Sequence, residues 1–332
     1  MNNLPKRQQG VALMIVLFIF ALVSILSVGM YNRQGLFVQT TANILAQSQT
    51  YQYALSSEVY GRRLLKDSWD KKDEEPSEES KLIKNSLLIP VDDAFLEAQI
   101  NDLQGRLNIN DLVKLDGSVN SVMVERFARL FDRLAIETIK VDVLIDWIDE
   151  NQDPSNLTGV EDEAYLSLEP PYRNAGQAFN HVSELLLLPN PDGDEAKRHE
   201  EYEKLLAHIS ALPQGYIKIN INTASKEVLQ SLSDKLGDDQ VEEIVSMREE
   251  EDGGWKDVGS FISEPLVQGA EIKAEEISVR SDFFEIATVI TLGDRKARLV
   301  SVIYRDNKDG VMQVLFRDQG QKYLITKEKI AL

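Results

Sequence analysis

The sequence contains no cysteine and only three histidines among its 332 residues. Without cysteine the chain can form no disulfide, no thiolate metal site and no thiol nucleophile. Basic residues are also scarce, since 36 Lys and Arg stand against 55 Asp and Glu, a formal net charge of -19 at pH 7. Binding to a nucleic-acid backbone requires clustered positive charge. The composition therefore argues against that class of protein and favours a solvated acidic surface, or carboxylates gathered around a cation.

Proline is absent between Pro5 and Pro76, and residues 11–30 carry no charged side chain. A helix of that length rises about 30 Å, which matches the hydrocarbon core of a bilayer. Apolar positions continue beyond it with loose helical spacing. We therefore predict one helix over residues 11–65, roughly 80 Å long, whose first half lies in lipid or in the core of a filament and whose second half packs on a folded domain.

The apolar run and the residues before it allow three interpretations. The run can be a plain single-pass anchor, or a secretory signal cut near residues 27–29, although it is long for that purpose. The third interpretation places a cut before the run, between Gly10 and Val11. A short basic leader, a glycine and then an unbroken apolar helix resemble the type IV prepilin class. Lys6 and Arg7 place the N-terminus in the cytoplasm and the bulk of the chain across the membrane, by the positive-inside rule.

Strand and helical patterns alternate in the remainder of the chain. Residues 66–81 are charged and interrupted by proline, which predicts a linker, and residues 95–109 alternate as a strand does. From about residue 110 to residue 263 the apolar spacing is helical. Strand character returns near the C-terminus in three stretches separated by hairpin signals, residues 283–292, 296–304 and 311–316. Because strands flank the helical block, we predict an α+β fold with a large all-helical insertion.

Two short segments of the helical block repeat each other. Asn108-Ile109-Asn110 and Asn220-Ile221-Asn222 each place a β-like run before a helix start. The repeat indicates two related helical units, or a chance similarity between two helix starts.

Residues 219–261 resemble the helix-hairpin-helix module of DNA-binding proteins. In that module a glycine-containing hairpin presents backbone N–H groups to phosphate. Here the hairpin carries Asp234, Asp238 and Asp239 around Gly237, and these carboxylates would repel a phosphate. We interpret the module as a scaffold that does not bind nucleic acid; the alternative is a membrane-tethered DNA-binding protein of the competence type.

Patterns typical of catalytic sites are missing from the sequence. His181, His199 and His208 lack HExxH spacing, and the sequence has neither a GxSxG motif nor a P-loop. We predict that the chain is not an enzyme.

Acidic side chains are concentrated between residues 146 and 194. Asp149, Asn151 and Asp153 begin like an EF-hand loop, but Pro154 stands where glycine is required and the twelfth position is Val160. Massed oxygen ligands in loops suit Ca²⁺, which takes six to eight of them. We predict an irregular calcium site assembled from two loops, with the ligands Asp153, Glu161, Asp162, Asp192 and Asp194. The alternative is a solvated acidic surface.

The fifth position after the expected cut differs from the usual pilin pattern. Pilins typically have glutamate there, whereas counting from Val11 gives Ile15 in this chain. The missing glutamate, the helical insertion and the motifs around Asn108 and Asn220 together resemble the type II secretion system protein K family, over essentially the whole sequence. Val11 is a mild departure, since many pilins begin with phenylalanine.

A glutamate at position five makes insertion of the helix into the membrane less favourable, by about a few kcal/mol on the insertion scale for a charged residue at the membrane centre. A filament subunit offsets this cost by pairing the glutamate with the N-terminal amine of the subunit above. Ile15 requires no such partner, which is compatible with a place at the filament tip.

The resemblance implies a minor pseudopilin in the tip complex that initiates and caps the pseudopilus during export of folded proteins across the outer membrane. Its partners would be the other minor pseudopilins and the major pseudopilin, and prepilin peptidase would process it and leave Val11 N-methylated. The protein would be a single-pass inner-membrane protein with its bulk in the periplasm. Family members bind calcium in the insertion, which would consist of helix-hairpin-helix or SAM-like repeats. The implied divisions are a leader (1–10), a membrane helix (11–30), a periplasmic helix with linker and first strands (31–109), the insertion (110–275) and the last strands (276–332).

Overall fold

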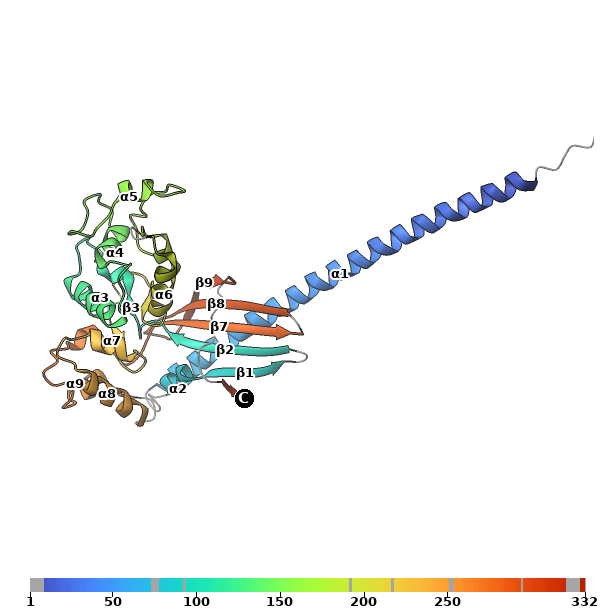
Figure 1. Ribbon diagram of the computed structural model, residues 1–332. Helices are drawn as coiled ribbons and strands as arrows, with labels where there is room; N and C mark the ends of the chain where they lie inside the picture. Colours follow the sequence, from blue (N-terminus) through green and yellow to red (C-terminus); the bar gives the residue numbers. More distant parts are fainter. Residues whose placement is uncertain are drawn as a thin grey trace, which may run out of the picture.

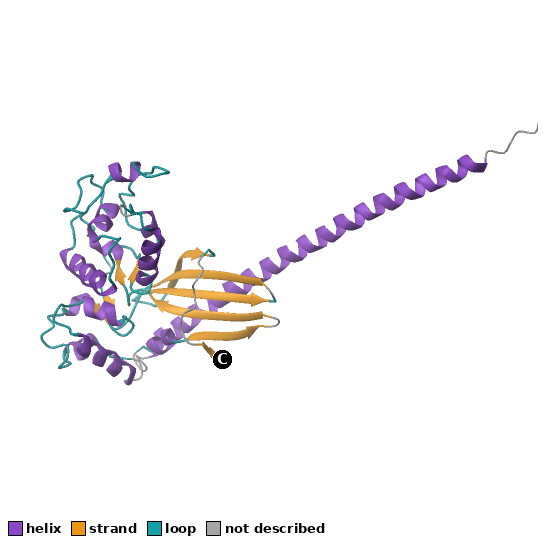
Figure 2. Ribbon diagram, viewed as in Figure 1, coloured by secondary structure: helices purple, strands orange, loops and turns teal. Residues whose placement is uncertain are grey.

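The computed structural model describes residues 9–72, 78–91, 94–190, 193–215, 218–250, 254–293, 295–320 and 329–331. Figure 1 shows a long N-terminal helix, a sheet packed along the second half of that helix, and a helical domain at the end of the sheet away from the helix's free half. Figure 2 shows that the long strands are gathered in this one sheet. The α+β architecture predicted from the sequence is confirmed.

Helix α1 (Gln9–Asp70) is continuous over 62 residues, as the absence of proline predicts. From Val11 to residue 49 its side chains are almost all exposed. Burial begins at Thr50 and then recurs every three or four residues along one face, at Ala54, Ser57, Glu58, Gly61, Leu65, Ser68 and Trp69. This face lies on the sheet, and Gly61 allows a close approach, because a Cβ there would lie 2.9 Å from Ile286 Cδ1.

The sheet has six strands in the order β10-β1-β2-β7-β8-β9. All neighbouring pairs are antiparallel except β10 with β1. The strands are β1 (Ser86–Val91), β2 (Ala94–Asp102), β7 (Phe283–Leu292), β8 (Arg295–Arg305), β9 (Met312–Asp318) and β10 (Lys329–Ala331). The three predicted C-terminal strands are therefore present. Since β2 and β7 are neighbours, everything between them is inserted into one antiparallel pair, as predicted.

Two boundaries differ from those that the sequence indicates. The expected linker over residues 66–81 is largely helical where it is described, because α1 continues to Asp70 and α2 (Glu78–Lys84) follows. The expected strand over residues 95–109 ends at Asp102, whose carboxylate accepts the Gln104 N–H at 2.7 Å and closes a turn.

The junction of α1, α2 and the sheet is held by Arg305, which is completely buried. Its Nη2 donates to Glu79 Oε2 and to the Ser281 carbonyl, and its guanidinium lies over the rings of Trp69 and Phe284. Burial raises the pKa of Glu79, while the Arg305 charge opposes that rise. Apolar residues of α1 and the sheet fill the space around this pair.

The inserted domain consists of two consecutive units that share one hydrophobic core. The first contains β3 (Leu107–Asn108), η1 (Ile109–Leu112), α3 (Ser121–Leu134), α4 (Val141–Ile148), α5 (Asp162–Leu166), η2 (Val182–Leu187), α6 (Glu195–Leu205) and β4 (Ile209–Ser210). The second contains β5 (Ile219–Asn220), α7 (Lys226–Ser231), α8 (Asp238–Glu250), α9 (Val258–Ile262), η3 (Ala274–Glu276) and β6 (Ile277–Ser278). The prediction that the insertion is all-helical is wrong, because each unit also has one short parallel strand pair, β3 with β4 and β5 with β6, formed by segments far apart in the sequence.

An asparagine closes each unit in the same way. In the first unit Asn110 Nδ2 donates to the carbonyls of Phe179 and Leu212, and its Oδ1 accepts the Phe179 N–H at 2.7 Å. In the second, Asn222 makes the same three bonds with Trp255 and Val279. We call these sets the asparagine brackets. They show that the repeat around Asn108 and Asn220 marks two related units and is not chance.

Candidate functional site

The N-terminal part of α1 is the first candidate site. Among the described residues, α1 is the one helix that is long and apolar enough to cross a membrane. Its most apolar stretch has no buried residues. Ile15 is 52% exposed on this segment, and Gly10 and Val11 lie in the first turn of the helix. Residues 1–8 of the predicted leader lie outside the described residues, so the cut after Gly10 stays a prediction.

The second candidate site is the segment between α4 and η2, which includes the short helix α5 and which we call the α4–η2 loop. Buried oxygen atoms in this loop and at the end of α4 lack hydrogen-bond partners. Asp146 is fully buried near the end of α4; its Oδ1 accepts the Ser155 N–H at 2.9 Å, but its Oδ2 has no hydrogen-bond partner. Glu161 Oε1 and Asn174 Oδ1 are likewise buried and unpartnered. Glu161 and Asn174 are hydrogen-bonded to each other through their other side-chain atoms, since Asn174 Nδ2 donates to Glu161 Oε2 at 2.9 Å. Two carboxylates and one amide therefore each leave a buried oxygen unused.

Gly159 packs so closely against Asp146 and Ser155 that position 159 has no room for a side chain. A Cβ built on Gly159 would lie 2.3 Å from Asp146 Oδ2 and 2.4 Å from the Ser155 carbonyl oxygen. A side chain at position 159 would therefore displace the Asp146 carboxylate or the Ser155 backbone.

The electrostatics of this loop favour bound protons or a cation. Burial, the largest cause, and the neighbouring charges of Asp146, Asp149 and Asp162 together raise the pKa of Glu161 to about 7, although the Asn174 hydrogen bond lowers it. Burial likewise raises the pKa of Asp146 and of Asp149. Carboxylates this close together and this far from water cost free energy when all are ionised.

The five predicted ligands do not converge as a set in the described part of the chain. Asp162 accepts from Arg173 and from the Asn174 N–H, each at 3.0 Å, and Asp153 is exposed. Asp194 caps α6 through the Lys197 N–H, and Asp192 lies outside the described residues. No three His, Asp or Glu side chains within the described ranges are placed to hold a metal by themselves.

Sequence reasoning did not select Asp146 and Asn174 as ligands. The sequence placed Asp146 on a helix, which is correct, but it gave no sign that this helix ends beside the loop with one carboxylate oxygen turned inward. Nothing in the sequence marks Asn174, since a single asparagine in a loop is common.

The hairpin of the second unit is poorly suited to binding a phosphate. The Gly237 N–H, which a phosphate would need, donates to Gln240 Oε1 at 3.0 Å. Lys235 forms an ion pair with Glu271, and Asp238 is paired with Arg133 at 2.8 Å. The DNA-binding alternative therefore lacks structural support.

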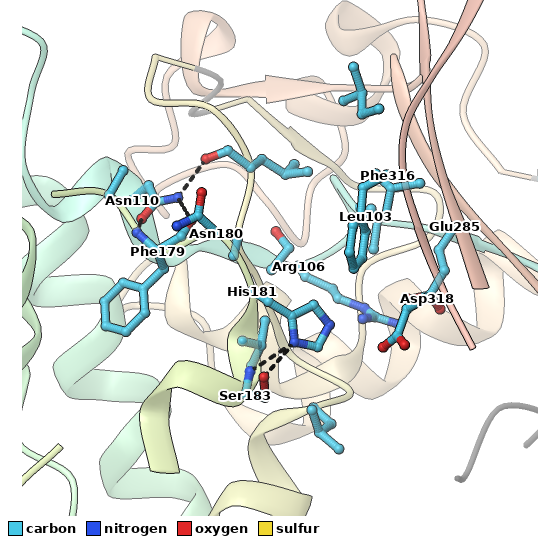
Figure 3. A pocket seen from close by; sticks show the side chains of 18 of the residues that line it. Leu103, Arg106, Asn110, Phe179, Asn180, His181, Ser183, Glu285, Phe316 and Asp318 are labelled. Carbon is cyan, nitrogen blue, oxygen red and sulfur yellow. Dashed lines mark hydrogen bonds between the residues drawn. The ribbon is translucent and has the colours of Figure 1, made fainter. Parts of the chain in front are cut away.

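The third candidate site is a cavity of about 760 Å³ between the first helical unit and the sheet. Figure 3 shows Leu103, Phe316 and Glu285 on its sheet side and Phe179, Asn180 and His181 on its helical side. The centroids of the His181 and Phe316 rings lie 5.9 Å apart across it. The side chains of Ser183 and His181 are hydrogen-bonded to each other. Both domains are thus needed to form the walls.

The sequence of this chain is similar to those of known proteins. Family models for type II secretion system protein K match residues 105–214 and 219–280, which are the two units of the inserted domain. The type II secretion system protein K of Pseudomonas aeruginosa is 33% identical over 95% of this chain and 94% of that protein. The Aeromonas hydrophila protein of the same description is 28% identical over 95% and 98%.

A solved structure has the same fold. It is a chain of the GspK-GspI-GspJ complex from the type II secretion system of enterotoxigenic Escherichia coli, with a TM-score of 0.69 and 23% identity, and the match covers 85% of this chain and 99% of that chain. Because the similarity to the Pseudomonas protein extends over the helix, the sheet and both bracketed units, this chain belongs to the type II secretion system protein K family.

Proposed function

We propose that this chain is a minor pseudopilin of the inner membrane that joins a tip complex with its own counterparts of GspI and GspJ. The observation that carries the proposal is α1, whose apolar first half is free of the folded domain while its second half is fixed to the sheet. A helix built this way can lie in the bilayer and then in a filament core. The solved complex that contains a chain of this fold supports the choice of companions.

Processing follows from the same helix. Prepilin peptidase would cut after Gly10, and Val11 would become the N-methylated end of a chain whose bulk is in the periplasm. Mass spectrometry of the purified protein should find an N-terminus at Val11, and Gly10→Asp should leave the precursor uncut but still inserted. An N-terminus at Met1 or Met30 in the wild-type protein would contradict the proposal.

The place at the tip rests on Ile15. With no carboxylate at position five, the subunit has nothing to pair with the N-terminal amine of a subunit above it. Ile15→Glu supplies that carboxylate, so we expect the variant to enter the filament body or to insert less readily. Cysteine crosslinking between the variant and the major pseudopilin in sheared filaments would measure this. Unchanged insertion and unchanged crosslinking would show that Ile15 is only a lipid contact.

We further infer that the loop between α4 and η2 holds a structural calcium ion. Asp146, Glu161 and Asn174 fit this role, since each has a buried, unpartnered oxygen, and oxygen is the donor that Ca²⁺ prefers. Asp149, Asp153, Asp162, Asp192 and Asp194 are further oxygen donors of the same acidic region. A bound cation would supply the positive charge that these buried carboxylates lack and would join the loop to the end of α4. Its role would be structural, in keeping with an assembly protein.

A further inference from the structure

The edge strand β9 has an irregularity that places two apolar side chains side by side. Along β8 and β9 the register pairs Val302 with Phe316 and Ile303 with Val314, which leaves Leu315 as an extra residue. Successive side chains of a regular strand point to opposite faces, whereas a bulge re-aims one of them. As a result both Leu315 and Phe316 line the cavity described above, next to Val302.

These apolar side chains remain open to solvent. Leu315 is 47% exposed and Phe316 is 40% exposed. β9 is last in the strand order of the sheet, and within the described part of the chain it pairs with β8 alone, so its other side is an edge of the described sheet. An exposed apolar edge is a template for pairing with a further chain, and a side-chain pocket beside such an edge gives that pairing its specificity.

The charge around the cavity selects the chemistry of an occupant. Glu203, Glu285 and Asp318 contribute three carboxylates to its walls, and Arg106 is the one Lys or Arg among the described residues that line it. Figure 3 shows Arg106 extending toward Asp318 and Glu285 on the sheet side. Because negative charge is in excess, a cationic group would be favoured near the apolar wall.

We propose that this cavity receives an extended segment of one of the two companion pseudopilins, with a large apolar side chain seated on Leu315 and Phe316 and a Lys or Arg beside it. The proposal rests on the proposed function for the existence of those companions. A volume of about 760 Å³ exceeds a single side chain and accommodates a short segment. Since the walls come from both domains, the occupant would contact the sheet and the helical insertion at once.

The test uses the full-length chain expressed with its own counterparts of GspI and GspJ. A photo-crosslinking amino acid is placed at Leu315, and at Leu157 as a matched control, since Leu157 is an apolar residue that is 100% exposed on the α4–α5 loop. We expect Leu315 to crosslink to one companion, at a peptide that contains a large apolar residue next to a Lys or Arg, and we expect Leu157 not to crosslink there. A crosslink at Leu315 to an acidic peptide, or to none, would overturn the proposal.

Substitutions provide an independent measurement. Leu315→Asp should lower the amount of companion that co-purifies by about tenfold or more, the effect of losing an apolar anchor, whereas Leu157→Asp should leave it unchanged. Glu203→Lys should lower it through charge alone, and an unchanged thermal transition checks that each variant is folded. If the wild-type chain recovers no companion, the proposed function fails; if the complex forms equally well with Leu315→Asp and Glu203→Lys, the cavity assignment fails and the function stands.

Discussion

At the scale of single residues, the α4–η2 loop is governed by atoms that lack partners. A buried polar atom without a hydrogen bond costs free energy, so native proteins leave few of them. Asp146 Oδ2 near the end of α4, and Glu161 Oε1 and Asn174 Oδ1 in the segment after it, are such atoms, and Gly159 packs directly against the first of them. The free energy lost in this arrangement is recovered only when something positive, a proton or a metal ion, binds there.

Gly159→Ala should therefore abolish the response to calcium. Calcium should raise the thermal unfolding temperature of the wild-type protein, because a ligand at 100 times its dissociation constant stabilises the folded state by about 2.7 kcal/mol. The alanine Cβ would overlap Asp146 Oδ2 and the Ser155 backbone, so it would displace that carboxylate and remove the gain. Gly237→Ala is the control, since its Cβ would meet only Gln240 Oε1 at an ordinary 3.5 Å. A wild-type response in Gly159→Ala would contradict the assignment of Asp146.

Glu161 predicts how stability depends on pH when calcium is chelated. Its carboxyl has a pKa of about 7 in the folded protein against 4.5 unfolded, so between these values the unfolded state releases a proton that the folded state retains. The stability due to this group is complete below pH 4.5 and is lost as pH rises to 7, by up to about 3 kcal/mol. Chemical denaturation at several pH values in a chelator should show this decline, and Glu161→Gln should reduce it. A profile unaffected by Glu161→Gln would mean that the carboxyl is not buried as described.

At the scale of elements, α1 shows where sequence patterns succeed and where they mislead. The absence of proline and the apolar spacing correctly predict one long helix. The charged run after residue 65 indicates a linker, yet the helix continues, because Lys66 pairs with Asp70 at 2.9 Å and Trp69 is buried beneath Gly310 and Arg305. Those last contacts join residues about 240 positions apart, which no local pattern can reveal.

The contact of α1 with the sheet can be tested at a glycine. Gly61→Leu should destabilise the fold by about 1–3 kcal/mol, since overpacking a tight contact has that cost and even a Cβ would lie 2.9 Å from Ile286. Gly35→Leu is the matched control on the same helix, where nothing lies within 4 Å. Urea denaturation of the full chain in detergent measures the difference. Equal midpoints for the two variants would contradict the close packing at Gly61.

At the scale of the whole molecule, the two units of the insertion behave as one body. Their buried apolar residues form a single cluster, and Arg126 of the first unit, which is 1% exposed, forms an ion pair with Glu276 of the second. The flanking strands predict where the insertion begins and ends. This ion pair could not be predicted, because it depends on how α3 faces η3 across 150 residues of chain.

Removing one partner of this ion pair should lower the stability of both units. Glu276→Ala would leave the buried guanidinium of Arg126 without its carboxylate, and the loss of one partner of a buried pair costs about 3–5 kcal/mol. Glu275→Ala removes an exposed neighbouring carboxylate and serves as the control. Calorimetry of the full chain should show a lower transition temperature for Glu276→Ala alone. Two separate transitions in the wild-type protein would contradict the coupling of the units.

The two asparagine brackets also determine which parts of the insertion can vary in length. Each bracket closes its own unit, the first with Phe179 after the long excursion of residues 149–178, the second with Trp255 soon after α8 ends. A bracket fixes the two ends of the connection that it closes and leaves the residues between them unconstrained. The connection can therefore be long and rich in carboxylates, as in the first unit, or short, as in the second, without changing how the unit is closed.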